Sequence, residues 1–173
     1  GLKCSAIPET MVLTSIPVST FKTNNLLAFG IFSASMIVPI RKMGDPCLLV
    51  RSSEVAAGDF NQTELLQLIQ DLRDTQRHLG GVGIAAPQIG VNKRVILIEY
   101  YQRDITRYAN VGDCPLRVII NPEIEFLTDE CAVFNEGCLS LPGLRGEVSR
   151  PVGIAYKYYD QFGELHSGED FGF

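Results

Sequence analysis

The residues of this chain that are best suited to catalysis or metal binding lie at 136–140, where the sequence reads E-G-C-L-S. Gly137 has no side chain, so another backbone or a ligand can come close to the neighbouring Cys138. Three interpretations are open for Cys138: a small buried apolar residue, a nucleophile or a metal ligand. Because free cysteines are among the most buried residue types, the pentapeptide by itself does not choose between them.

A second stretch of small residues lies at 81–88 and reads G-V-G-I-A-A-P-Q. Its G-x-G spacing superficially fits a dinucleotide-binding fingerprint, which needs a strand before it and a helix after it. Here a predicted helix comes before the stretch and a predicted strand after it, and Pro87 directly follows Ala86. The pattern therefore does not support nucleotide binding. The small residues instead leave backbone N–H and C=O groups with which an extended peptide can pair. Gln88 adds an amide N–H that can point at a developing oxyanion, unless the stretch is only a packing turn with Gln88 in solvent.

The two stretches are more specific together than apart. Residues 81–88 resemble the G-x-G-x-A-A-x-Q motif of peptide deformylases, and residues 136–140 are identical to the E-G-C-L-S motif of that family. Their order and separation fit, and residues 36–46 resemble the usual start of the family. The chain is thus identified as a member of the peptide deformylases over residues 36–173. These metal hydrolases remove the formyl group from the N-terminal formyl-methionine of newly made polypeptides.

The resemblance implies a role for each matching residue. Gln88 and the backbone N–H of Leu139 would stabilise the oxyanion of the formyl group. The backbones of Val82, Gly83 and Gly137 would hold the peptide in an extended form. The expected partners are therefore the N termini of nascent polypeptides, with association with the ribosome as a further option.

By the same resemblance Cys138 is a metal ligand, and a thiolate is indeed a good ligand for iron or zinc. Ferrous iron is the usual ion of the family, and zinc, nickel or cobalt can take its place. The family completes the site with two histidines and a glutamate of an H-E-x-x-H helix. This sequence contains no H-E-x-x-H, and neither His78 nor His166 is followed by glutamate. We therefore expect a C-terminally truncated deformylase that lacks two histidine ligands and is inactive by itself.

Two other functions fit the same residues. A deformylase-like module could bind peptide N termini without catalysis. A cysteine hydrolase could use Cys138 with His166 as its base, which requires the two side chains to touch. His166 is not favoured as a replacement metal ligand, because a ligand set needs several convergent groups. Glu136 is predicted to form a structural ion pair with Arg145 or Arg150, although these arginines could instead meet the peptide.

The helix and strands predicted from the sequence do not alternate regularly. They indicate an α+β fold, with mostly antiparallel sheets packed around helices. A capping box at Asn61 and Glu64 predicts a helix that runs to about His78 and stops at two glycines. Leu65, Leu68, Ile69 and Leu72 form its expected buried face, with Arg73, Asp74 and Gln76 opposite. Strands are predicted at 94–99, 117–121 with 123–127, and 152–160, with a loop at 100–115. A hairpin turn at 160–164 then leads to a return strand from Leu165.

Composition restricts the class of protein further. The chain has 173 residues, 46% of them hydrophobic and 20% charged, which suits one globular domain at 36–173. The net charge is −5 and no basic run occurs, so direct nucleic-acid binding is not expected. Residues 1–35 are rich in Ser and Thr and read as a targeting extension or as spurious sequence. The apolar run at 26–40 is too short and too broken to span a bilayer. The cytoplasm of a bacterium is the expected location, with a mitochondrion or plastid as the alternative.

Overall fold

The computed structural model describes residues 36–101 and 112–171, so the predicted extension at 1–35 lies outside the described residues. The helices are α1 (Thr63–His78) and the short 3-10 turns η2 (Pro46–Leu48), η3 (Ala57–Asp59) and η4 (Ala86–Ile89). The strands are β1 (Gly83–Ala85), β2 (Val95–Tyr100), β3 (Cys114–Phe126), β4 (Cys131–Gly137), β5 (Arg145–Pro151), β6 (Gly153–Tyr159) and β7 (Leu165–Phe171).

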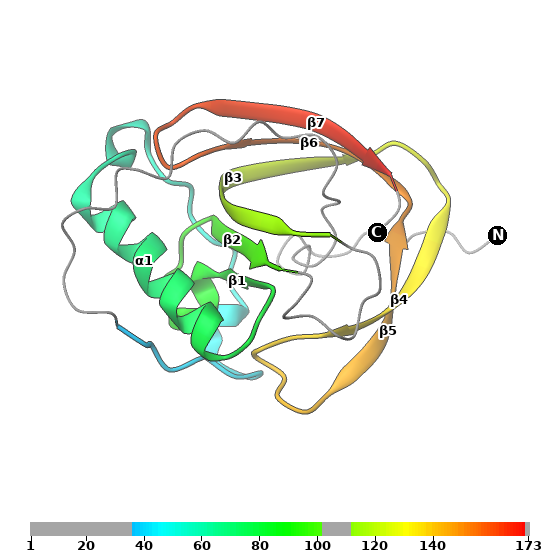
Figure 1. The fold of residues 1–173 in the computed structure, drawn as a ribbon, viewed down its shortest axis with the longest axis horizontal. Helices are drawn as coiled ribbons and strands as arrows, with labels where there is room; N and C mark the ends of the chain where they lie inside the picture. Colours follow the sequence, from blue (N-terminus) through cyan, green and yellow to red (C-terminus); the bar gives the residue numbers. More distant parts are fainter. Residues whose placement is uncertain (1–35, 102–111, 172–173) are drawn as a thin grey trace.

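The strands form two antiparallel sheets. Five of them pair in the order β1-β2-β3-β6-β7, and β4 and β5 form a separate hairpin. Figure 1 shows α1 on one side of the molecule and the β4–β5 hairpin on the other. This arrangement confirms the predicted α+β fold with antiparallel sheets.

Helix α1 ends at His78 as predicted, but the predicted capping box is wrong. The N-cap is Gln62, whose side chain makes no capping hydrogen bond, and Asn61 has a left-handed φ of 59°. The backbone N–H of Asn61 bonds to the carbonyl of Gln161 in the β6–β7 turn, so a tertiary contact fixes this residue. Local spacing between Asn61 and Glu64 could not reveal that contact.

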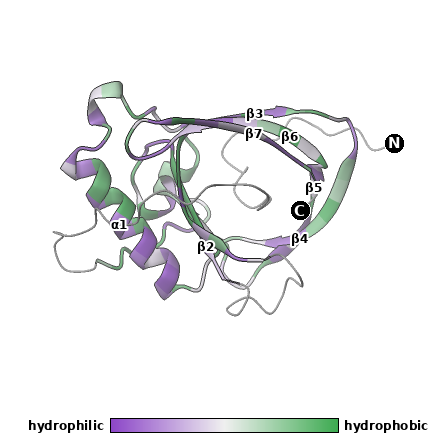
Figure 2. Ribbon diagram, turned by 45° about the horizontal axis from the view of Figure 1, so that its top comes forward, coloured by the Kyte–Doolittle hydropathy of each residue, from purple (hydrophilic) through white to green (hydrophobic). Residues whose placement is uncertain are grey.

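The predicted buried face of α1 is confirmed. Leu65, Ile69 and Leu72 are buried, and Leu68 packs against the same cluster. Figure 2 shows a hydrophobic β2 beside an α1 that carries both hydrophobic and hydrophilic residues. The assignment of Gln76 to the outer face is wrong, because only 1% of this residue is exposed.

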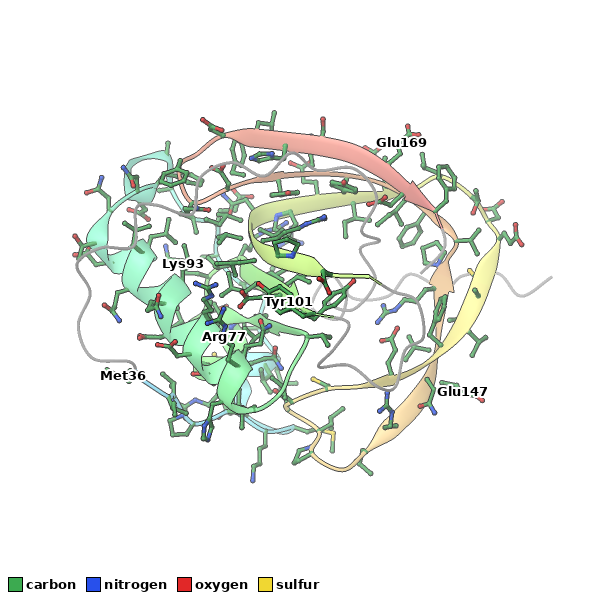
Figure 3. The ribbon with its side chains drawn as sticks, viewed as in Figure 1. Met36, Arg77, Lys93, Tyr101, Glu147 and Glu169 are labelled. Atoms are coloured by element: carbon green, nitrogen blue, oxygen red, sulfur yellow. The ribbon has the colours of Figure 1, made fainter. Side chains whose placement is uncertain are left out.

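A buried carboxylate explains why polar residues of α1 turn inward. Glu99, on β2, accepts hydrogen bonds from both Arg73 and Arg77, at 2.8–3.1 Å. Gln76 donates to the backbone carbonyl of the same glutamate at 2.8 Å. Figure 3 places Arg77 and Tyr101 close together between α1 and the end of β2. Burial by itself would raise the pKa of Glu99, but the two arginines outweigh it and lower the pKa from 4.5 to about 2.

The predicted strands at 94–99 and 152–160 and the return strand from Leu165 are confirmed as β2, β6 and β7. The two segments at 117–121 and 123–127 are one strand, β3, with an irregularity between Ile120 and Glu123. The predicted loop at 100–115 is wrong at its ends, because Tyr100 pairs with Cys114 across β2 and β3. Residues 102–111 lie outside the described part.

Hairpin β4–β5 was not predicted as a pair of strands. Its sequence at 145–151 reads R-G-E-V-S-R-P, which lacks the alternation of a half-buried strand. Strand β5 forms because seven residue pairs join it to β4, from Cys131 opposite Pro151 to Gly137 opposite Arg145. This hairpin carries the E-G-C-L-S motif to the other motif.

Candidate peptide-binding and metal site

The side chain of Gln88 is held in one orientation at the end of β1. Its Oε1 accepts a hydrogen bond from the backbone N–H of Ala85 at 2.9 Å. Its Nε2 lies 3.2 Å from Ser140 Oγ and 3.6 Å from Cys138 Sγ. The turn that carries Gln88 ends at Gly90, whose φ of 88° suits glycine. The two sequence motifs therefore meet through this amide.

Cys138 is the first residue of the loop that joins β4 to β5. Its thiol is free and the residue is exposed. The loop folds on itself, because the N–H of Leu141 bonds to the carbonyl of Cys138 and that of Leu144 bonds to the carbonyl of Leu141. An exposed thiol beside a buried amide rules out the first interpretation of Cys138, a small buried apolar residue.

Leu139 connects the loop to the glycine stretch by direct packing. A Cβ atom added at Gly81 would lie 3.0 Å from Leu139 Cδ1. This is closer than most real contacts, so Gly81 allows the close approach of Leu139. Leu139 also packs against the cluster of buried residues beneath α1.

Strand β1 is an edge strand, because it pairs only with β2 in the sheet order. The carbonyl of Val82 accepts a hydrogen bond from the N–H of Glu99 on β2, and the N–H of Ala85 bonds on the other side to Gln88. Since backbone groups alternate along a strand, the N–H and C=O of Gly83 point to the same open side as those of Ala85. Gly83 therefore offers the backbone pair that an added strand would use.

Glu136 forms the predicted ion pair with Arg150 and not with Arg145. The guanidinium of Arg150 donates to both carboxylate oxygens, at 2.8 and 2.6 Å, and both side chains are about nine-tenths buried. Arg145 instead donates to the backbone carbonyl of Asn135. Because Arg145 lies opposite Gly137, it faces the other side of the hairpin from Glu136. The remaining site residue, Gly137, thus ends the hairpin beside an anchored neighbour.

Comparison with known proteins decides the family. The family model described as polypeptide deformylase matches residues 37–173. The chain belongs to the peptide deformylase family. It is 41% identical to a peptide deformylase of Leptospira biflexa over 122 residues, which covers 70% of this chain and 68% of that protein. It is 45% identical to peptide deformylase 2 of Ralstonia nicotianae over 128 residues, covering 74% and 70%.

Solved deformylase structures agree with this assignment. A class I type b peptide deformylase of Acinetobacter baumannii, with Met-Ala-Ser bound, superimposes with a TM-score of 0.74 at 34% identity. The match covers 80% of this chain and 86% of that one. The deformylase of Thermotoga maritima gives a TM-score of 0.65 at 32% identity, covering 79% and 83%.

Deformylases are metal-dependent, and Cys138 is the residue of this deformylase chain that the sequence predicts as a ligand. Cys138 can offer a thiolate, but across 36–101 and 112–171 no group of three potential ligands includes it. His166 belongs to a different group, with Asp160 and Glu164, where its Nε2 lies 3.1 Å from Asp160 Oδ2. His78 is exposed at the end of α1. A single thiolate does not make a metal centre, because a bound ion needs further protein ligands.

The structure adds positioning contacts to the deformylase site that sequence reasoning missed. Ser140, the last residue of E-G-C-L-S, bonds to Gln88 through its hydroxyl. The backbone N–H of Arg41 bonds to the carbonyl of Gln88, and that of Met43 bonds to the carbonyl of Ser140. Ser140 could have been suspected from its place in the motif. The backbone bonds of residues 41–43 leave no signal in side-chain types.

Proposed function

We propose that this chain binds the N-formyl-methionine end of nascent polypeptides and contributes to removal of the formyl group by hydrolysis. The observation that carries the proposal is the amide of Gln88, which is held beside the exposed thiol of Cys138 next to the open edge of β1. This arrangement supports the proposal because the edge of a sheet, a hydrogen-bond donor and a thiol lie at one place.

The peptide would lie along β1 as an added antiparallel or parallel strand. Gly83 offers its N–H and C=O at the open edge, and Val82 beside it supports that edge through its bond to Glu99. Gly137 would contribute its backbone beside Cys138, at the end of β4. The Met-Ala-Ser bound to the A. baumannii deformylase is a peptide with an unblocked N terminus, which supports such a peptide as the product.

The donors for the formyl oxygen would be Nε2 of Gln88 and the backbone N–H of Leu139. Attack of water turns the formyl carbon tetrahedral and places negative charge on its oxygen. Donors fixed beforehand stabilise that charge without reorganising during the reaction. Both donors flank Cys138, so the formyl oxygen would lie close to its sulfur.

Cys138 would supply one ligand to a metal ion, with Fe²⁺ as the proposed ion and zinc, nickel or cobalt as alternatives. A bound metal ion polarises a carbonyl and activates water at neutral pH.

Residues 36–173 would form one deformylase domain that works in the bacterial cytoplasm, at or near the ribosome. No helix of the described residues is long and apolar enough to cross a membrane.

The cysteine-hydrolase alternative is not supported by the described residues. Cys138 Sγ lies beside Gln88, whereas His166 bonds to Asp160 and stacks on Tyr158 with ring centroids 5.2 Å apart. A nucleophile and its base must lie within hydrogen-bond reach of each other. The non-catalytic binding module keeps the same peptide site, so it differs from the deformylase only in turnover.

Gln88→Leu should remove the preference of the chain for a formylated peptide. Binding of formyl-Met-Ala-Ser and of Met-Ala-Ser is measured by calorimetry. The affinity ratio should fall about fivefold or more, because a hydrogen bond to the formyl oxygen is lost. Gln62→Leu is the matched control, since Gln62 is exposed and makes no capping bond. A preference that survives in Gln88→Leu would contradict the proposed donor.

Turnover is measured on the same 173-residue chain, with Fe²⁺ supplied under anaerobic conditions. No H-E-x-x-H occurs in its sequence, so we expect binding without hydrolysis of formyl-Met-Ala-Ser. Formate release that a chelator abolishes would show that these residues suffice for catalysis. That result would refute the expectation of an inactive polypeptide while leaving the peptide-binding proposal intact.

A further inference from the structure

We propose that Ser140 is a positioning residue that fixes the side-chain amide of Gln88, so that one N–H remains aimed at the bound formyl oxygen. This inference rests on the proposed function, because the formyl oxygen is the acceptor that the amide would meet. It concerns a residue that neither donates to the substrate nor binds the metal.

The backbone determines which end of the Gln88 amide faces the site. The N–H of Ala85, 2.9 Å away, can only donate, so the atom that it meets must be the oxygen Oε1. The nitrogen Nε2 must then lie on the opposite side, toward the loop that begins at Cys138. The orientation of the amide is thus set by a strict donor.

Ser140 then takes one of the two hydrogens of this nitrogen. Its Oγ lies 3.2 Å from Nε2, and Ser140 and Gln88 are 6% and 7% exposed. The second hydrogen is left on the side of Cys138 Sγ, 3.6 Å from Nε2. Because Cys138 is exposed, a ligand that comes to its sulfur would meet this second N–H.

Ser140 can act as a fixed point because its own backbone is tied to another part of the chain. Its carbonyl accepts a hydrogen bond from the N–H of Met43 at 3.0 Å, and the neighbouring Arg41 donates to the carbonyl of Gln88 at 2.7 Å. One short segment therefore holds both partners of the side-chain bond. Removing the hydroxyl leaves a buried N–H without its acceptor. The N–H of Ala85 still holds Oε1, but Nε2 loses its bond to Ser140 and can shift away from the position that serves the formyl oxygen.

Ser140→Ala tests the role by the ratio of affinities for formyl-Met-Ala-Ser and Met-Ala-Ser. We expect the ratio to fall about threefold to tenfold, as for loss of one neutral hydrogen bond. The ratio is independent of the fraction of folded protein, so partial unfolding does not imitate the effect. Ser140→Thr keeps the hydroxyl and should retain most of the preference, and Ser167→Ala, at an exposed position on β7, should retain all of it.

A double variant separates positioning from a direct effect. If Ser140 acts through Gln88, Ser140→Ala should change the ratio no further in a Gln88→Leu background. An additional loss in that background would overturn the proposal. An unchanged ratio in Ser140→Ala alone, with the wild-type chain preferring the formyl peptide, would overturn it as well.

NMR of the Gln88 side chain keeps the inference testable without any ligand. In the wild-type chain the Nε2 proton that bonds to Ser140 should have a shift displaced from that of a free amide, and in Ser140→Ala this proton should move toward the free-amide value. If the wild-type chain shows no formyl preference, the proposed function fails. In that case unchanged Gln88 shifts in Ser140→Ala would also overturn the positioning by Ser140, and movement of the one proton toward its free-amide value would support it.

Discussion

Arg150→Ala is expected to lower the free energy of unfolding by about 3–5 kcal/mol, since it leaves a buried carboxylate without its partner. Arg150 donates two hydrogen bonds to Glu136, and neither side chain has more than 10% of its surface exposed. The pair fixes the end of β4 directly before Gly137 and Cys138. Urea unfolding followed by circular dichroism at pH 7 measures the change.

Two comparisons make this prediction specific. Lys157→Ala removes one side of an ion pair with Glu123 whose members are 53% and 63% exposed, and should change stability far less than Arg150→Ala, because solvent screens an exposed pair. A double variant, Glu136→Leu with Arg150→Met, should lose much less than Arg150→Ala, because no charge stays buried. If Arg150→Ala and Lys157→Ala have equal effects, the buried pair does not stabilise the hairpin as inferred.

Glu99→Gln should lower the free energy of unfolding by about 3 kcal/mol at pH 7, because two arginines lose their charged partner. The carboxylate of Glu99 accepts from Arg73 and Arg77, and its pKa of about 2 lies below the ordinary 4.5. A lowered pKa means that the unfolded chain takes up the proton first as the pH falls. The stability due to Glu99 is therefore complete above about pH 4.5 and is lost progressively toward pH 2.

The pH dependence distinguishes this cluster from general acid unfolding. The difference in unfolding free energy between the wild-type chain and Glu99→Gln should be constant from pH 5 to 7 and should shrink as the pH falls below about 4.5. Thermal or urea unfolding of both proteins at matched pH values gives that difference. A difference that stays the same down to pH 3 would contradict the lowered pKa of Glu99.

Local sequence signals predicted the parts of the molecule that local rules govern. The buried face of α1 and its end follow from helical spacing and from the two glycines after Leu79. Strand β2 and the β6–β7 hairpin follow from apolar content and turn residues. These features are fixed mostly by neighbours in the chain, so a single sequence reveals them.

Contacts between residues that are far apart in the sequence could not be predicted from such local signals. The capping residue of α1 is Gln62 because Asn61 bonds to the carbonyl of Gln161, a hundred residues away in the chain. Gln76 is buried because Glu99 is in reach across the helix–sheet boundary. A helical pattern cannot show which polar side chain meets a partner on another element.

The sequence by itself determined the family, since both motifs are contiguous strings, and it narrowed the partner of Glu136 to two arginines. Only the tertiary structure decided between them. In the register of β4 and β5, Arg150 lies opposite Ala132 on the face of Glu136, and Arg145 lies opposite Gly137 on the other face. A shift of the register by one residue would exchange the two faces of β5. The register depends on which strand pairs with β5 and which face is buried, and neither can be read from the sequence of β5 alone. The same pairing brings Cys138 and Ser140 to Gln88 and joins two motifs into one site.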